Sequence, residues 1–164
     1  MSLKETIKDD MKTAFKAGDS VARSTLSMLL STIQNRELDK RAKLMKAGAT
    51  TEADVAEKSV LTDEETLEAI TSELKKRRDA VAQYEAAGRP ELAAGESAEA
   101  AVLAKYLPEQ LTEEAVRALI TEAIATTGAS GASDMGRVMG AVTPKTKGRF
   151  DGGKVNQLVK EMLG

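Results

Sequence analysis

The sequence predicts an all-α protein, with an N-terminal helical domain that contains a long helical hairpin and a small C-terminal bundle of short helices. Alanine, leucine, glutamate and lysine dominate the composition, and these residues favour helices. Apolar residues recur at spacings of three and four, and no β-branched run alternates convincingly with polar residues. Pro108 marks the predicted boundary between a domain at residues 1–107 and a domain at residues 108–164.

The first helix has clear start and stop signals. Ser2 and Glu5 have the spacing of a capping box, and Gly18 suits the left-handed position that follows a helix. Its apolar residues recur every four positions, so we expect them to face the core together. They are Leu3, Ile7, Met11 and Phe15.

The second helix begins near residues 19–20 and loses its apolar face part-way along. Its predicted core residues are Leu26, Leu29, Leu30 and Ile33. Beyond Ile33 basic residues take over, so we expect the far end of this helix to project into solvent. These are Arg36, Lys40, Arg41, Lys43 and Lys46. Residues 48–60 have the pattern of a loop with weak helical character, and we expect this segment to be the most mobile.

A further long helix begins at a second capping box, Thr62 and Glu65, and ends before Gly88 and Pro90. Its predicted interior positions are Leu67, Ile70, Leu74, Val81 and Tyr84. Arg77 occupies a position where this rhythm requires an apolar residue. We favour the interpretation that Arg77 pairs with an acid on a neighbouring helix or extends past the helix edge. The alternative is a phosphate-facing band that consists of Lys75, Lys76, Arg77 and Arg78.

Short helices follow a helix at residues 90–106. Thr112 is the predicted cap of one helix, which ends at Gly128. Ser133 or Asp134 begins the next, which Pro144 interrupts, and residues 145–148 form a single turn. Asp151 caps the last helix. The apolar residues expected to form their common core are Val116, Leu119, Ile120, Ile124, Met135, Val138, Met139, Val142, Val155, Leu158, Val159 and Met162.

Residues 134–153, which read DMGRVMGAVTPKTKGRFDGG, combine basic residues with many glycines. Lysine and arginine neutralise phosphates, and glycines let backbone N–H groups approach a phosphate closely. The candidate RNA-binding residues are Arg137, Lys145, Lys147, Arg149 and Lys154, with support from Lys75, Lys76 and Arg78. A structural interpretation stays open. Gly136 and Gly140 would let two helices pack closely, Gly148 and Gly152 would serve a turn and a helix end, and the basic residues would form a solvated edge.

The charges and the missing residue types narrow the possible functions. The chain has 26 acidic and 24 basic residues, but the segment from Asp134 onward carries a net charge of +3, which favours a local anionic partner. It contains no Cys and no His, so thiol nucleophiles, disulfides and the usual zinc ligand sets are excluded. We expect no cofactor and no metal. No apolar run is long enough to span a membrane and no apolar signal region begins the chain, so we expect a cytoplasmic protein without membrane or DNA partners.

Several motifs carry a family resemblance. They are YLPEQL at residues 106–111, DMGRVMG at 134–140, PKTKGR at 144–149 and DGG at 151–153. Together they resemble the GatB/YqeY family, and SELKKRRDAV at residues 72–81 is similar to the N-terminal domain of stand-alone YqeY-like proteins. The resemblance extends over nearly the whole chain.

The resemblance implies a role near tRNA. In the B subunit of the glutamine-dependent Asp/Glu-tRNA amidotransferase, a similar tail domain helps to hold the tRNA, and the chemical steps take place on other domains. By resemblance, residues 108–164 would bind tRNA, and a tRNA synthetase or an amidotransferase would be the protein partner. The family label would be a carbon–nitrogen ligase with glutamine as amido donor. The chain has neither a P-loop nor an amidase signature and is too short for either catalytic domain.

Three functions therefore remain as alternatives. The first is a non-catalytic, tRNA-associated adaptor, which we favour. The second is a protein-interaction module that acts through the helix pair around residues 36–46 and 75–78. The third is an enzyme, which would need a pair of carboxylates in a cleft. The adjacent acids of this chain, such as Glu64 and Glu65, lie in first helical turns, where they complement the helix dipole.

Overall fold

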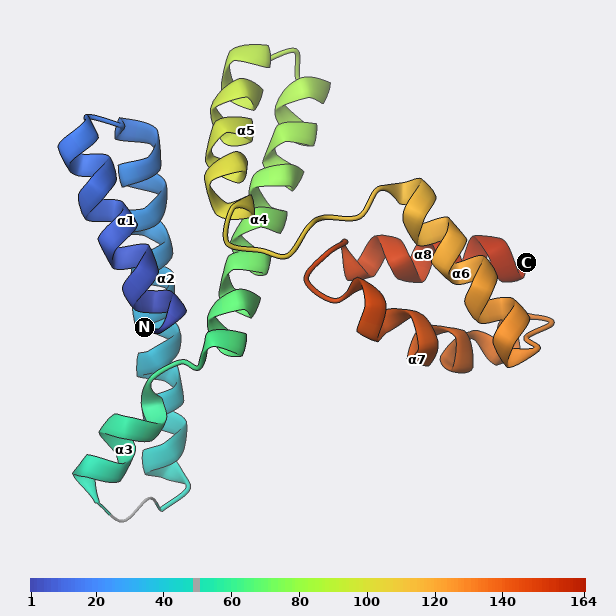
Figure 1. The fold of residues 1–164 in the computed structure, drawn as a ribbon, viewed down its shortest axis with the longest axis horizontal. Coiled ribbons are helices and arrows are strands. Elements are labelled where there is room, and N and C mark those ends of the chain that lie inside the picture. The colour runs from blue at the N-terminus through green and yellow to red at the C-terminus, as the bar shows by residue number, and fades with distance from the viewer. Residues whose placement is uncertain (49–50) are drawn as a thin grey trace. The chain divides into compact units, whose positions relative to one another are not determined.

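The structure, a computed structural model, describes residues 1–48 and 51–164, and over these residues it is helical without strands, which confirms the all-α prediction (Figure 1). The helices are α1 (Leu3–Ala17), α2 (Ser20–Lys46), α3 (Glu52–Ser59), α4 (Asp63–Ala86), α5 (Pro90–Ala104), α6 (Glu113–Thr127), the 3-10 turn η1 (Ala132–Asp134), α7 (Met135–Thr146) and α8 (Gly152–Leu163). They divide into two compact units, Met1–Tyr106 and Leu107–Gly164.

Unit 1 is built from two helical hairpins. Helices α1 and α2 form one hairpin and α4 and α5 form the other, and α2 contacts both helices of the second hairpin (Figure 1). Both hairpins contribute large aliphatic side chains that are completely or almost completely buried. They include Ile7, Leu26, Leu29, Ile33, Ile70, Leu74 and Leu103. Burial of these side chains is the main force that holds unit 1 together.

The predicted helix ends of unit 1 are confirmed. Ser2 with Glu5 and Thr62 with Glu65 form complete capping boxes, in which each side chain bonds the backbone N–H of the other residue. Gly18 has φ = 72°, the left-handed conformation that a glycine adopts without a steric penalty. These local signals depend on residues three or four apart, which is why the sequence alone revealed them.

The segment expected to be a loop contains a helix, so that prediction was wrong for most of its length. Helix α3 begins after Thr51, whose side chain accepts a hydrogen bond from the backbone N–H of Asp54. Val55 and Leu61 are buried, and α3 packs against α2. Helix α3 therefore packs against one side of the far end of α2, while Lys43, Met45 and Lys46 stay exposed there as expected. Residues 49–50 of the expected loop lie outside the described residues.

Phe15 was expected in the core but its side chain is 63% exposed. The reason is geometric. A spacing of four residues advances about 400° around a helix, so the series Ile7, Met11, Phe15 turns by about 40° at each step. Ile7 and Ala14, seven residues apart, return to nearly the same direction, and both are buried. The core stripe of α1 follows this heptad spacing and leaves Phe15 outside.

Arg77 pairs with acids on a neighbouring helix, as the favoured interpretation stated. One guanidinium nitrogen lies 3.2 Å from a carboxylate oxygen of Glu96, and Nε lies 3.2 Å from an oxygen of Glu99. Both acids belong to α5, and all three side chains are largely buried. The charged residue at an apolar position thus connects α4 to α5.

Unit 2 is a bundle in which α6, α7 and α8 share one core. Its most deeply buried residues are Val116, Ile120, Val138, Val142, Val155 and Val159. Thr112 and Asp151 cap α6 and α8 as predicted. Asp134 does not cap α7 through its side chain; it ends η1 and instead accepts a hydrogen bond from the N–H of Ser130 at 3.0 Å.

Two predictions about α7 were wrong. Pro144 does not end the helix, which continues to Thr146. A proline at this position removes a bond to the carbonyl of Gly140, and because Gly140 is exposed, water can reach that carbonyl. The glycines of α7 also do not mediate close helix packing. A Cβ placed on Gly136 or Gly140 would meet no atom within 4 Å.

Candidate nucleic-acid interface

The candidate residues gather at the connection from α7 to α8, which we call the basic turn (residues 145–154). Helix α7 ends when the backbone N–H groups of Arg149 and Phe150 both bond the carbonyl of Thr146, at 2.9 and 3.0 Å. Gly148 lies between Thr146 and Arg149 with φ = 72°, so a residue with a side chain would be strained there. Thr146 is buried, and its hydroxyl donates to the carbonyl of Val142 at 3.1 Å. The backbone of the turn is therefore well defined.

Residues 109–111, which precede α6, form hydrogen bonds with the basic turn. The N–H of Leu111 donates to the carbonyl of Arg149 at 2.8 Å, and the side-chain amide of Gln110 donates to the carbonyl of Gly148 at 2.9 Å. In return, Nε of Arg149 donates to the carbonyl of Glu109 at 3.0 Å. Three hydrogen bonds thus join residues 109–111 to the turn. Sequence reasoning missed this role of Glu109 and Gln110, although both lie in the motif YLPEQL.

The cations of the basic turn differ in how far they are engaged. Lys145 is half exposed, and its ammonium lies 3.4 Å from a carboxylate oxygen of Glu122. Lys147 and Lys154 are exposed, and Arg149 is half-buried because it bonds Glu109. The structure therefore brings four of the five predicted C-terminal residues together, three of them with accessible ammonium groups.

Arg137 lies apart from the other four. It is eight residues before Lys145 on α7, which corresponds to about 12 Å along the helix axis. Its guanidinium pairs with Asp134 and donates to the carbonyl of Thr127 at 3.3 Å. The hydrogen bond from Arg137 holds the pKa of the Asp134 carboxyl below its ordinary value. Arg137 thus links the start of α7 to the end of α6. Its contacts are structural and lie away from the basic turn.

Asp151 modifies the electrostatics of the turn. Its carboxylate accepts the N–H of Lys154 at 2.9 Å and so occupies the start of α8. A Cβ on Gly153 would lie 3.1 Å from the same carboxylate oxygen, whereas Gly152 has open space. The capping carboxylate competes with any phosphate for the first N–H groups of α8. The proposed contribution of these glycine N–H groups to phosphate binding stays a prediction.

The supporting residues Lys75, Lys76 and Arg78 belong to α4 of unit 1. Lys76 lies 2.7 Å from an oxygen of Glu73, and Lys75 lies 3.8 Å from one of Asp79. Acids on the same helix thus partly neutralise this run of charges. Arg78 is exposed.

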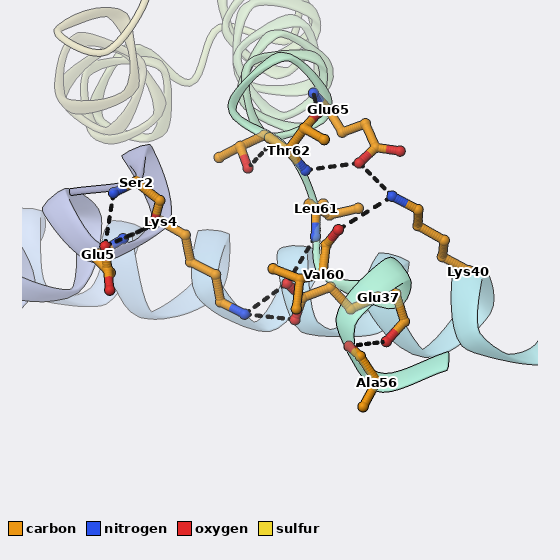
Figure 2. Close-up of polar contacts among 12 residues, drawn as sticks. Ser2, Lys4, Glu5, Glu37, Lys40, Ala56, Val60, Leu61, Thr62 and Glu65 are labelled. Carbon is orange, nitrogen blue, oxygen red and sulfur yellow. Dashed lines mark hydrogen bonds and ion pairs between the residues drawn. The ribbon is translucent and has the colours of Figure 1, made fainter. Parts of the chain in front are cut away.

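Another charged cluster of unit 1 has a structural role, and we call it the Glu37–Glu65 network (Figure 2). Lys4 of α1 lies 2.6 Å from a carboxylate oxygen of Glu37 on α2, and Glu37 also accepts the backbone N–H of Leu61 at 3.2 Å. Lys40 donates to Glu65 at 2.7 Å and to the carbonyl of Val60 at 3.2 Å. Figure 2 shows that these contacts meet where the chain passes from α3 to α4. The network connects α1, α2 and the start of α4.

The network lowers the pKa of Glu65 below its ordinary value, first through the hydrogen bond from Lys40 and then through the N–H of Thr62. Sequence reasoning assigned Lys40 to a solvated helix end, because its partners are 20 and 25 residues away. Along the described parts of the chain, no cluster of three or more acidic residues could hold a metal ion. No helix within residues 1–48 or 51–164 is both long and apolar enough to span a membrane.

Comparison with known proteins agrees with the motifs. The profile of the YqeY-like protein family matches residues 4–51 and 43–163, which is nearly the whole chain. The chain belongs to the YqeY-like protein family. The family membership confirms the resemblance drawn from residues 72–81, 106–111, 134–140 and 144–153.

A curated relative is the "Altered inheritance of mitochondria protein 41, mitochondrial" of Candida glabrata. It is 29% identical to this chain over 104 residues, which cover 63% of this chain and 49% of the relative. This chain therefore matches about half the length of the relative. The name of that fungal protein places it in mitochondria, and a cytoplasmic location for this YqeY-like chain stays a prediction.

Proposed function

We propose that this YqeY-like protein is a non-catalytic accessory protein that binds structured RNA, of the tRNA class, through the basic turn. The observation that carries the proposal is the combination of Lys145, Lys147 and Lys154 as accessible cations on a turn whose backbone is held by hydrogen bonds from two sides. Because the turn is ordered before binding, little conformational entropy is lost when phosphates bind.

The character of the surface suits a duplex or folded RNA better than a single strand. Structured RNA is recognised mainly through its shape and its phosphates, whereas single strands are held by stacking of bases on aromatic rings. Phe150 is the aromatic residue of the basic turn, and it packs against the core of unit 2. Its ring therefore serves the fold.

The family supports association with tRNA metabolism as part of the proposal. The resemblance to the tail domain of the amidotransferase B subunit makes tRNA the RNA class to test first, and a tRNA synthetase or an amidotransferase the protein partner to test. We do not propose carbon–nitrogen ligase activity for this chain, because its adjacent acids lie in the first turns of helices, where they complement the helix dipole. Glu65, for example, accepts the N–H of Thr62 at 2.8 Å.

The alternative of a protein-interaction module at the helix pair around residues 36–46 of α2 and 75–78 of α4 has weaker support. Helix α3 packs against one side of the far end of α2, and Lys40 there bonds Glu65 and the carbonyl of Val60. Lys75 and Lys76 lie close to acids of their own helix. These contacts favour the basic turn as the surface that binds.

The test is binding of bulk tRNA to the purified protein, measured by fluorescence anisotropy over a salt series. The variant replaces Lys145, Lys147 and Lys154 with Gln and keeps Arg149, which braces the turn through Glu109. We expect saturable binding, and we expect the slope of log affinity against log salt to become shallower by about 2–3 in the variant, roughly one for each lost contact.

A matched control removes the same charge from unit 1 by replacement of Lys8, Lys43 and Lys46, which are exposed, with Gln. The control should keep most of the affinity and most of the salt slope. Equal losses in the two variants would show that only net charge matters, and would contradict the assignment to the basic turn. An absence of saturable binding by the unaltered protein would overturn the proposal of RNA binding itself.

A further inference from the structure

The hairpin of α1 and α2 carries an open groove near the connection between the two helices. The groove has a volume of about 430 Å³. Its lining residues are Met11, Lys12, Phe15, Lys16, Arg23 and Ser27. Those from α1 lie in two adjacent pairs one helical turn apart, and those from α2 are also one turn apart. The groove therefore follows the direction of the two helices.

The lining of the groove includes two large apolar side chains, Met11 and Phe15. Phe15 is 63% exposed, and the guanidinium carbon of Arg23 lies 4.9 Å from the centre of its ring. This cation–π contact holds the two side chains against each other. Phenylalanine, methionine and arginine are enriched in the centres of protein interfaces, and such anchors carry much of the binding energy. Met11 and Phe15 would meet an apolar side chain of a partner.

The lining of the groove is also positively charged. It contains three cations and no acid. Lys12 pairs with Asp9 at 2.8 Å, but Lys16 and Arg23 form no ion pair with any acid in the described parts of the chain. On a chain with a net charge of −2, this is a local concentration of positive charge. The complement of the groove is a segment that places carboxylates beside a large apolar side chain.

We propose that this groove binds an acidic amphipathic helix of a protein partner. The apolar face of that helix packs on Met11 and Phe15, and its carboxylates pair with Lys16 and Arg23. A helix matches the groove because two neighbouring helices form its walls, the arrangement by which grooves take up helices with apolar residues at spacings of three and four. RNA suits it less, because Arg23 covers a face of the Phe15 ring on which a base would stack.

The test is titration of the ¹⁵N-labelled full chain with a synthetic helical peptide, followed by NMR. The peptide has about 16 residues of alanine and glutamate with two leucines four positions apart. We expect saturable shifts of amide signals at residues 11–27. We also expect at least tenfold weaker binding for Phe15→Ala and for the double variant Lys16→Glu with Arg23→Glu, whereas Lys160→Glu in α8 keeps the affinity of the unaltered chain. The groove variants should still bind tRNA.

Three further measurements test the role of the cations and the other possible occupants of the groove. A peptide with glutamine for every glutamate should bind at least tenfold more weakly, and equal binding would contradict the role of the cations. Stronger binding of a uridine oligonucleotide of the same charge would overturn the proposal in favour of RNA. Self-association in sedimentation experiments that Phe15→Ala abolishes would assign the groove to a second copy of this chain. Absence of any shift at the groove would also overturn the proposal.

Discussion

The Glu37–Glu65 network and the basic turn use the same kinds of residue and serve different ends. In the network, Lys4 and Lys40 are largely shielded from solvent, and their ammonium groups lie 2.6 and 2.7 Å from carboxylate oxygens. In the basic turn, the ammonium of Lys145 lies 3.4 Å from a carboxylate oxygen of Glu122, and both side chains are half exposed or more. What distinguishes the two regions is how far the fold shields the lysine side chains from solvent. A lysine becomes a structural ion pair or an accessible charge according to how deeply its surroundings bury it.

The largest expected effect comes from removal of the central acid of the network. Glu37→Ala leaves the largely buried Lys4 ammonium and the N–H of Leu61 without their acceptor. We expect a loss of about 2–3 kcal/mol in the free energy of unfolding, measured by urea titration. Asp39→Ala, on the exposed face of the same helix, is the control and should change stability by less than about 0.5 kcal/mol. Equal effects of the two changes would remove the contrast between network and surface.

Arg77→Leu tests the other shielded ion cluster of unit 1. Removal of the guanidinium leaves Glu96 and Glu99 close together, each with about four-fifths of its side chain buried. We expect a loss of about 2 kcal/mol, seen as a lower melting temperature. The triple variant with Glu96→Gln and Glu99→Gln should recover most of the loss, because the uncompensated charges are gone. An unchanged melting temperature for Arg77→Leu would show that Arg77 only extends past the helix edge.

Asp151 offers a test of the basic turn itself. Asp151→Ala removes the cap of α8 and should cost about 1 kcal/mol of stability, measured by thermal unfolding. Asp151→Asn keeps a capping oxygen but removes the negative charge. We therefore expect the Asn variant to be nearly as stable as the unaltered chain and to bind tRNA more tightly, because the carboxylate no longer competes with phosphates. Weaker tRNA binding by the Asn variant would contradict this account of the turn.

The smallest expected effect is a pH dependence that belongs to the network. The pKa of Glu65 is lower in the folded protein than its ordinary value of 4.5, because Lys40 and Thr62 bond the carboxylate. This contribution to stability is fully present above pH 4.5 and is lost as the pH falls through the lower pKa of the folded state. Glu65→Gln should flatten the dependence of stability on pH in this acid range. Identical acid unfolding curves for the two proteins would contradict this role.

The sequence revealed local features reliably and distant contacts poorly. The caps at Ser2, Thr62 and Asp151 depend on neighbours three positions away, and all three were predicted correctly. The ion pair between Glu37 and Lys4 joins residues 33 positions apart, and no sequence pattern indicates it. Phe15 was misassigned because a spacing of four fits a helix face only approximately. The helix at α3 was missed because its buried Val55 is isolated among polar and small residues.

The candidate site shows the same division. Its cations and Gly148 could be found because they are close in sequence and chemically distinctive. Which cations bond backbone carbonyls and which stay accessible could not be predicted, because this depends on acceptors elsewhere in unit 2. Arg149 bonds the carbonyl of Glu109, and Arg137 bonds that of Thr127. Backbone carbonyls carry no residue identity, so such partners cannot be identified from residue types.

The bonds from residues 109–111 to the basic turn decide where unit 2 can be cut for separate study. A fragment that begins at Thr112 would keep α6, α7 and α8 with most of their shared core. Its circular dichroism spectrum would therefore be that of a folded helical domain. It would nevertheless lack the donors of Gln110 and Leu111 and the acceptor of Glu109. Such a fragment would underreport the affinity of the parent protein for its ligand, so a faithful fragment should start no later than Leu107.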